Sequence, residues 1–255
     1  MEAMPPDYTP PTPLPPTSTP PTPALSPVAE LRGIRVDFGE TRAVDGVDLD
    51  IPRAALTALV GSNGSGKSTL IEVVAGARMP SAGTVRVHAR ARAFVPQRTA
   101  VAERLPLTVD DVVRVGAWGR VGPLGRLDRS ARAAVDDALR RTDMTALRRR
   151  PFAALSGGQR QRALLAQGLA RGADLLLLDE PTTALDAASA TLIRRAIAEE
   201  RARGTAVVCV SHDDRLIDEA DAIVHLEAGR RVPEVEQKSE EPRSPGALAG
   251  VRGGE

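Results

Sequence analysis

The sequence predicts an α/β protein with a mostly parallel β-sheet, an antiparallel β edge and an inserted helical subdomain. Short apolar runs of strand type alternate along the chain with segments of helical periodicity. This alternation is typical of a parallel sheet that helices cover on both faces. The part from about residue 105 to 170 has helical spacing and few strand signals, so it is the expected helical subdomain.

Three apolar runs are expected to form buried strands of the sheet. ALTALV at residues 55–60, LLLL at 175–178 and AVVCV at 206–210 are continuous rather than alternating. Continuous apolar runs are typical of strands that are buried on both faces. Apolar residues spaced three and four apart predict helices. These helices are expected at 67–75, 109–115, 130–141, 159–171 and 187–203.

The two ends of the chain differ from the middle in composition. Eleven of the 21 prolines lie within residues 1–27. Proline fixes φ and lacks an amide proton, so this Pro/Thr-rich segment is expected to be a disordered tail, with a proline-motif ligand as the alternative. Residues 234–255 are polar and rich in proline and glycine, which predicts a second disordered tail. The folded domain is therefore expected to span residues 28–233.

The composition excludes some classes of protein. The net charge is +1, so no bulk attraction to nucleic acid or to an anionic membrane is expected. The single cysteine, Cys209, cannot form an internal disulfide and suits a reducing cytosolic compartment. No apolar run approaches the roughly 18 residues of a membrane-spanning helix. The start of the chain also lacks the pattern of a secretion signal.

The segment GSNGSGKST at residues 61–69 matches a phosphate-binding pattern, G-x-x-x-x-G-K-[ST]. Glycines let the backbone amides point at phosphates, and the helix that follows adds the positive end of its dipole. Lys67 is expected to reach the β- and γ-phosphates, and the Ser68 hydroxyl to hold Mg²⁺. The residues expected to bind nucleotide are Gly61, Ser62, Asn63, Gly64, Ser65, Gly66, Lys67, Ser68 and Thr69.

Two acids, Asp179 and Glu180, follow the leucine run directly. A strand that ends in carboxylates can place them beside a phosphate site. Asp179 is expected to contact Mg²⁺, directly or through water, and Glu180 to act as the general base on the attacking water. The alternative is a solvated or helix-capping acid pair.

A second glycine-rich motif, LSGGQ, occupies residues 155–159 at the start of a predicted helix. A helix begins with free N–H groups and a positive dipole end, so this motif also suits a phosphate. One chain therefore carries two motifs for the same kind of ligand, 91 residues apart when counted from Gly66 to Gly157.

Taken together, these motifs resemble the ATP-binding cassette (ABC) ATPases over about residues 28–232. The resemblance implies ATP and Mg²⁺ as cofactors, and a P-loop NTPase fold of the ABC type with a RecA-like core. The motifs occur in the order that the family shows: Walker A at 61–69, the Q-loop glutamine Gln97, the signature at 155–159, Walker B at 175–180, the D-loop at 184–186 and the switch histidine His212.

The resemblance also implies why the chain has two phosphate motifs. Members of the family pack two copies head to tail, so that the signature of one copy faces the phosphate loop of the other. The signature residues Ser156, Gly157, Gly158 and Gln159 are therefore expected to bind ATP held by a second copy of this chain.

Further residue roles follow from the same resemblance. Gln97 is expected to sense the γ-phosphate and to bind Mg²⁺, His212 to contact the γ-phosphate and align the water, and Asp186 to communicate between the two sites. Phe38 lies 23 residues before the phosphate loop, where the family usually has an aromatic residue that stacks on adenine. The alternative for Phe38 is a place in the core.

The chain is similar to a stand-alone ATPase subunit of an importer. Only 57 residues separate Gln97 from Leu155, which leaves room for the helical subdomain and for no long insertion. The implied partners are separate polytopic permease subunits and, indirectly, an extracytoplasmic metal-binding protein, without nucleic acid. The implied location is peripheral, on the cytoplasmic side of the cell membrane. The alternative is a soluble ABC ATPase of repair, translation or regulation.

The middle of the chain resembles the zinc and manganese importer branch of the family. The resemblance rests on FVPQR, on LPLTVDDVVRVGAWGRVG, which contains the stretch from Gly116 to Arg120, and on LDRSARAAVDDAL. It favours zinc over manganese, with iron or an iron chelate as further alternatives, although Ala117 departs from the basic or polar residue expected there. Trp118 is expected either on the surface that docks the permease, because interfaces favour aromatic anchors, or in the core.

Zinc is expected as the cargo and not as a metal bound to this chain. Neither the histidines nor Cys209 show metal-ligand spacing, and Cys209 lies inside an apolar run and is expected in the core. The histidines are His88, His212 and His225.

Overall fold

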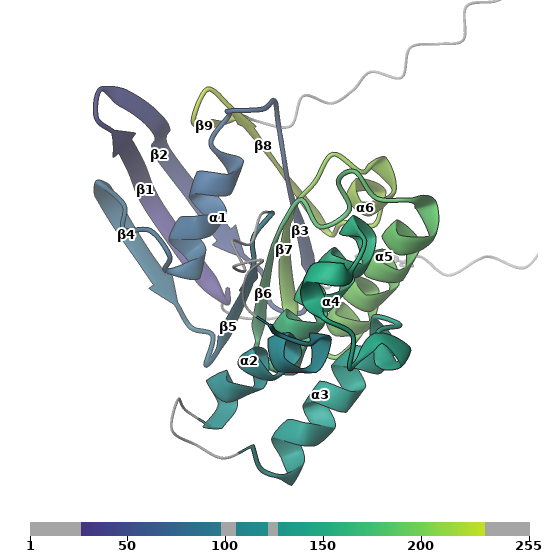
Figure 1. The fold of residues 1–255 in the computed structure, drawn as a ribbon. Helices are drawn as coiled ribbons and strands as arrows, with labels where there is room; N and C mark the ends of the chain where they lie inside the picture. The colour runs from purple at the N-terminus through teal and green to yellow at the C-terminus, as the bar shows by residue number, and fades with distance from the viewer. Residues whose placement is uncertain (1–26, 98–105, 122–126, 233–255) are drawn as a thin grey trace, which may run out of the picture.

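The computed structural model describes residues 27–97, 106–121 and 127–232. Within these ranges the chain forms two β-sheets and a group of helices that packs against the larger sheet (Figure 1). Apart from Pro27, the two predicted disordered tails lie outside the described residues. No helix in the described ranges is long and apolar enough to cross a membrane.

The larger sheet is mostly parallel, as predicted. Its strand order is β5-β6-β7-β3-β8-β9, and β9 alone runs antiparallel to its neighbour. The antiparallel strand β9 therefore forms one edge of the sheet. The strands are β3 (Leu56–Val60), β5 (Arg92–Val95), β6 (Leu175–Asp179), β7 (Ala206–Val210), β8 (Ala222–Glu227) and β9 (Arg230–Val232).

A separate antiparallel sheet lies beside the parallel one. It contains β1 (Ala29–Phe38), β2 (Thr41–Ile51) and β4 (Ala82–Val87), with β1 in the centre. A tight hairpin joins β1 to β2, since Phe38 pairs with Thr41. The helix α1 (Lys67–Ala75) contacts strands of both sheets (Figure 1), so it connects the two layers.

The remaining helices cover the opposite face of the parallel sheet and extend beyond it. The helices α2, α3 and α4 pack on one another, and α4 also contacts β5 and α5. The first three lie within the part expected to be a helical subdomain. The helices are α2 (Val109–Val121), α3 (Arg129–Arg141), α4 (Gly157–Ala170), α5 (Ala187–Ala202) and α6 (Asp214–Asp218).

The four leucines of β6 divide between two hydrophobic cores. Leu175 and Leu177 belong to the core that contains α1 and the antiparallel sheet. Leu176 and Leu178 belong to the core that contains α4 and α5. This division follows from the alternation of side chains along a strand. It explains why β6 is apolar at every position, since both of its faces are covered.

Most predicted elements are found close to their predicted bounds, but α2 is longer than predicted. It continues beyond residue 115 through Gly116 and Gly119 to Val121. Glycine is unfavourable inside a helix, so the pattern predicts an early end. The glycines are used for close packing instead, because a Cβ on Gly116 would lie 1.8 Å from the Gln167 carbonyl oxygen of α4.

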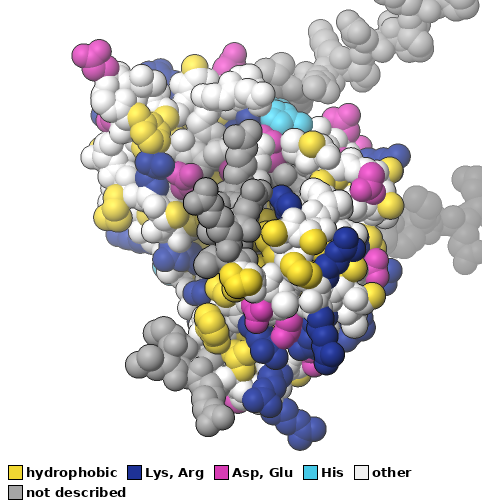
Figure 2. Space-filling view, viewed as in Figure 1, with side chains coloured by type: hydrophobic (Ala, Val, Ile, Leu, Met, Phe, Trp, Pro, Cys, Tyr) yellow, Lys and Arg dark blue, Asp and Glu magenta, His cyan; other side chains and the backbone are white. Residues whose placement is uncertain are grey.

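Arginine side chains gather at the helical end of the molecule (Figure 2). Several of them are paired with acids. Arg141 forms ion pairs with Glu199 and Glu200, and Arg148 with Asp110 and Asp136. Arg148 is partly exposed, so its pairs neutralise part of the positive charge of this surface, whereas the Arg141 side chain is buried.

Candidate active site

The loop between β3 and α1 can form only with glycine at two of its positions. Gly61 has a φ of 145°, and a Cβ there would lie 2.0 Å from the Leu226 carbonyl oxygen. Gly66 has a φ of 99°, and its Cβ would lie 2.4 Å from the Ala43 carbonyl oxygen. Both contacts are with backbone and cannot relax easily. The loop is therefore enclosed between β8 and β2, with its backbone tightly curled.

Lys67 is the first residue of α1 and is only 5% exposed. Its Nζ donates hydrogen bonds to the carbonyl oxygens of Gly61 and Ser62, each at 2.7 Å. Burial lowers the pKa of the Lys67 ammonium, while the nearby Glu180 and Asp179 carboxylates oppose the shift. The ammonium group therefore lies over the loop, where phosphates would be bound.

Asp179 lies at the end of β6, is only 6% exposed and faces α1. The Ser68 hydroxyl donates to its Oδ1 at 3.1 Å. Burial raises the pKa of Asp179, and repulsion from Glu180 and Glu72 adds to the rise, while the Ser68 hydrogen bond opposes it. A hydroxyl and a carboxylate are hard oxygen donors of the kind that Mg²⁺ takes, and a buried carboxylate is stabilised by a cation. The residues present therefore fit Mg²⁺.

Glu180 lies at the centre of a hydrogen-bond cluster. Its Oε2 accepts from Gln97 Nε2 at 2.5 Å and from Thr183 Oγ1 at 3.0 Å. His212 Nε2 lies 3.8 Å from Oε1, so the histidine flanks the other oxygen. The backbone of Glu180 has a φ of 49°, a left-handed conformation, and its N–H donates to the Val210 carbonyl oxygen at 2.9 Å. Strain of about 1–3 kcal/mol at such a residue is typical of functional sites.

A single pocket unites the residues predicted from separate motifs. It joins the phosphate loop to the ends of β5, β6 and β7, which are neighbours in the sheet. The sequence did not predict Ala43 and Thr183 as residues of this site. For Thr183, the one indication in the sequence is its position between the Walker B and D-loop motifs. The pocket is lined by Ala43, Asn63, Gly64, Gly66, Lys67, Ser68, Thr69, Gln97, Glu180, Thr183 and His212.

Other residues of the phosphate loop are more enclosed. Ser65 is buried, and its Oγ has no hydrogen-bond partner in the described part of the chain. Ser62 instead uses its carbonyl oxygen to hold Lys67 and to accept from the Ser65 N–H at 3.2 Å.

Phe38 lies outside this pocket, at the end of β1. Phe38 is 45% exposed, so the alternative of a place in the core is wrong. The guanidinium carbon of Arg78 lies 4.4 Å from the centre of the ring. One face of Phe38 is therefore in contact with a cation.

The signature residues lie away from the phosphate loop of the same chain, since none of them lines its pocket. Ser156 caps α4 and forms a capping box with Gln159. The Gln159 N–H donates to Ser156 Oγ at 3.3 Å, and the Ser156 N–H donates to Gln159 Oε1 at 3.1 Å. Beside them, a Cβ on Gly157 would meet no atom of the described residues within 4 Å. The start of α4 is therefore open to a ligand from outside the chain.

Asp186 caps the start of α5, next to the signature. It accepts from the Ser189 N–H at 2.8 Å and from the Ser189 hydroxyl at 2.9 Å, and these bonds lower the pKa of Asp186. Gly158 packs against this pair, because a Cβ there would lie 2.7 Å from Ser189 Oγ. The D-loop and the signature of one chain are therefore in contact.

The fold and the pocket define a P-loop ATPase, and comparison with known proteins places it in one family. The ABC transporter profile matches residues 44–183, and the chain belongs to this family. Its members hydrolyse ATP to drive transport, and the chain is the ATP-binding subunit of an ABC importer.

Three curated relatives are importer subunits with different cargoes. The hemin import ATP-binding protein HmuV of Streptomyces coelicolor is 42% identical over 217 residues, which cover 80% of this chain and 76% of that protein. The manganese transport protein MntB of Listeria innocua is 35% identical, covering 72% and 79%. The zinc transport protein TroB of Treponema pallidum is 37% identical, covering 68% of each.

Among solved structures, an inward-facing putative metal-chelate type ABC transporter is similar to this chain. Its TM-score is 0.71 at 25% sequence identity, over 80% of this chain and 82% of that one.

Proposed function

We propose that two copies of this chain form a head-to-tail dimer, hydrolyse MgATP at their interface and drive the import of a metal ion, with zinc as the first candidate. The observation that carries the catalytic part is the cluster of Gln97, Thr183 and His212 around Glu180, beside the Ser68–Asp179 pair. Glu180, the phosphate loop and Ser68, which is bonded to the buried Asp179, line one pocket, and this supports the proposal.

Each side chain of the pocket has a role that suits its place. Lys67 and the loop amides bind the β- and γ-phosphates. Ser68 and Asp179, with Gln97, hold Mg²⁺, which supplies positive charge against the phosphates. Glu180 accepts a proton from the attacking water, and His212, on its other oxygen, orients the γ-phosphate.

The second copy completes the site. This part of the proposal rests on the position of Ser156 and Gly157, which are open at the start of α4 and absent from the pocket of their own chain. The positive end of the helix dipole favours an anion at the start of α4, which supports a contact with the γ-phosphate held by the other copy. Asp186 lies beside it and passes the state of one site to the other.

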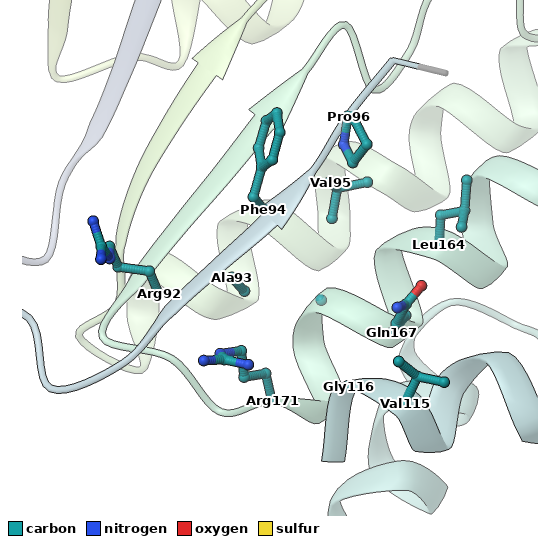
Figure 3. Close-up of a pocket in the computed structure, with 11 residues that line it drawn as sticks. Arg92, Ala93, Phe94, Val95, Pro96, Val115, Gly116, Leu164, Gln167 and Arg171 are labelled. Atoms are coloured by element: carbon teal, nitrogen blue, oxygen red, sulfur yellow. The ribbon is translucent and has the colours of Figure 1, made fainter. Parts of the chain in front are cut away.

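The permease subunits dock on a groove between β5, α2 and α4 (Figure 3). Arg92 and Arg171 lie toward one end of the groove, and Pro96, Val115 and Leu164 toward the other. Trp118 of α2 is 47% exposed, so the alternative that it is a core residue is wrong. An exposed tryptophan beside a groove with apolar and basic ends supports a protein contact. The chain is then peripheral, on the cytoplasmic side of the cell membrane.

Zinc is the first candidate cargo, delivered by an extracytoplasmic metal-binding protein. Support comes from the resemblance of segments within residues 94–139 to the zinc and manganese branch and from the relatives named for transport of these metals. Manganese is the alternative within this branch.

Hemin or another iron chelate is a second candidate. It is favoured by the 42% identity to a hemin import subunit and by the likeness to a metal-chelate type transporter.

Metal content of cells tests the cargo. The gene is deleted, cells are grown under metal limitation, and zinc, manganese and iron are measured by mass spectrometry. Complementation with wild type and with Lys67→Ala separates transport from other effects. Selective loss of zinc that wild type alone restores supports the proposal. Loss of manganese would identify manganese as the cargo instead of zinc, and loss of iron with poor growth on hemin would identify hemin or another iron chelate. Unchanged metals together with nucleic-acid-stimulated ATPase activity favour a non-transport ABC ATPase.

A further inference from the structure

Arg78 connects the helix α1 to the end of β1, two parts of the molecule that the proposed function treats separately. It follows α1, and its Nε donates to Glu72 Oε2 on that helix at 2.7 Å. Its guanidinium lies over the ring of Phe38 at the end of β1, 4.4 Å from the centroid.

The backbone holds this arrangement in place from both sides. The Arg78 N–H donates to the Glu72 carbonyl oxygen at 3.2 Å, which fixes the residue to α1. Three residues later, Ser81 donates its N–H to the Arg35 carbonyl oxygen at 2.7 Å, and its Oγ accepts from the Asp37 N–H at 3.0 Å. The segment that carries Arg78 is therefore attached to the strand that carries Phe38.

We propose that Arg78 is a positioning residue for the adenine of ATP, because it fixes the Phe38 ring so that the free part of the ring can stack on the base. The inference rests on the proposed stacking of Phe38. A guanidinium over an aromatic face is an attractive cation–π contact. A ring that is already held loses less rotamer freedom when a ligand binds, so the base binds more tightly.

The contact leaves room for the base. Phe38 is 45% exposed although Arg78 is in contact with one face, so a large part of the ring remains accessible. Phenylalanine has no hydroxyl that could bind the base or the backbone, so its orientation depends on packing alone. Arg78, which follows α1 and is bonded to Glu72 of that helix, packs on the ring and so contributes to its orientation.

Binding of ADP and of pyrophosphate, measured by calorimetry, tests the role. Neither compound requires hydrolysis, and only ADP carries the base. Arg78→Met removes the cation and keeps an aliphatic stem, so the affinity for ADP is expected to fall about two- to five-fold. The affinity for pyrophosphate is expected to stay unchanged. In turnover assays, KM for ATP rises and kcat changes little.

Arg35→Met is the matched control. Arg35 lies on the same strand as Phe38, is exposed and pairs with Asp45 at 3.4 Å. The substitution Arg35→Met removes a positive charge close to the same hairpin but leaves the contact between Arg78 and the Phe38 ring in place. The affinity for ADP is therefore expected to stay at the wild-type value. Arg78→Lys restores the charge without the flat guanidinium and is expected to recover part of the loss.

Phe38→Leu separates this inference from the stacking on which it rests. If Phe38→Leu leaves ADP affinity unchanged, the stacking proposal is wrong. If Phe38→Leu weakens ADP binding and Arg78→Met does not, the role proposed for Arg78 is wrong and the stacking proposal stands. Equal losses for ADP and pyrophosphate in Arg78→Met would show a charge effect and overturn the inference. In the double variant, the loss is expected to match that of Phe38→Leu, whereas fully additive losses contradict it.

Discussion

Replacement of Glu180 by glutamine separates the chemistry of the carboxylate from its structural contacts. The two hydrogen bonds that the structure records both end on one oxygen, Oε2, which accepts from Gln97 and Thr183. A glutamine with its amide oxygen at this position keeps both bonds. Its NH₂ group then takes the place of Oε1, the oxygen that His212 flanks at 3.8 Å. Only the basic oxygen is lost.

Two magnitudes follow from this geometry. Because both hydrogen bonds survive, the free energy of unfolding is expected to change by less than about 1 kcal/mol. Because an amide does not accept a proton, the turnover is expected to fall about 10²- to 10⁴-fold, which raises the barrier by about 3–5 kcal/mol. ATP still binds, so the variant is expected to accumulate as an ATP-bound dimer.

Phosphate release measures the turnover, urea unfolding measures the stability, and size-exclusion chromatography with ATP detects the dimer. Glu180→Ala is the comparison, since it leaves Gln97 and Thr183 without their acceptor and is expected to lose stability as well as turnover. Wild-type turnover in Glu180→Gln would refute the assignment of Glu180 as the general base. A large loss of stability in Glu180→Gln would instead refute the hydrogen-bond argument.

Three further predictions concern the metal end, the helical packing and the shared site. Asp179→Asn is expected to weaken MgATP binding and to raise the Tm of the nucleotide-free chain at pH 7. The Tm rises because folding raises the pKa of Asp179, so the ionised carboxylate destabilises the folded protein above that pKa, and asparagine carries no charge. As the pH falls through the raised pKa, wild-type Asp179 takes up a proton, and the difference in Tm between the two proteins should shrink; a constant difference would contradict the sign. Gly116→Ala is expected to cost about 1–3 kcal/mol in urea unfolding, because its Cβ would meet the backbone of α4 at 1.8 Å. Gly157→Ala, in open space, is the stability control, and equal stabilities of the two variants would argue against close packing of α2 on α4. Ser156→Arg and Lys67→Ala are each expected to be inactive alone and to recover partial ATPase activity when mixed, since a mixed dimer retains one intact site; full activity of either variant alone would exclude a shared site.

The parts of the site that sequence reasoning predicts best are local or follow from topology. The phosphate loop is predicted because its glycines, lysine and following helix are contiguous. The meeting of Gln97, Glu180 and His212 follows from parallel strands, since each residue comes shortly after a strand end and β5, β6 and β7 are neighbours. The order of the strands is not contained in any one of these segments.

The less predictable features depend on contacts between distant segments. Phe38 and Arg78 are each ordinary in sequence. The cation lies on the ring because β4 pairs with β1 and because Arg78, between α1 and β4, is bonded to Glu72 of α1. The length of α2 is hard to predict because glycine disfavours an isolated helix but allows two helices to pack closely, as Gly116 does here. The antiparallel strands β1 and β2 are interrupted by register shifts, which break the simple alternation that predicts a strand.

The strand β6 has a mechanical consequence for a transporter. Its tip carries Asp179 and Glu180, while Leu176 and Leu178 contact the core shared with α4 and Leu177 contacts the core shared with α1. A movement of the helical layer against the sheet would therefore shift β6 and the two acids at its end. A movement of the acids would in turn be passed to the helical layer. If the chain works as proposed, a force generated at the phosphates and a force received from a permease would both pass through this five-residue strand.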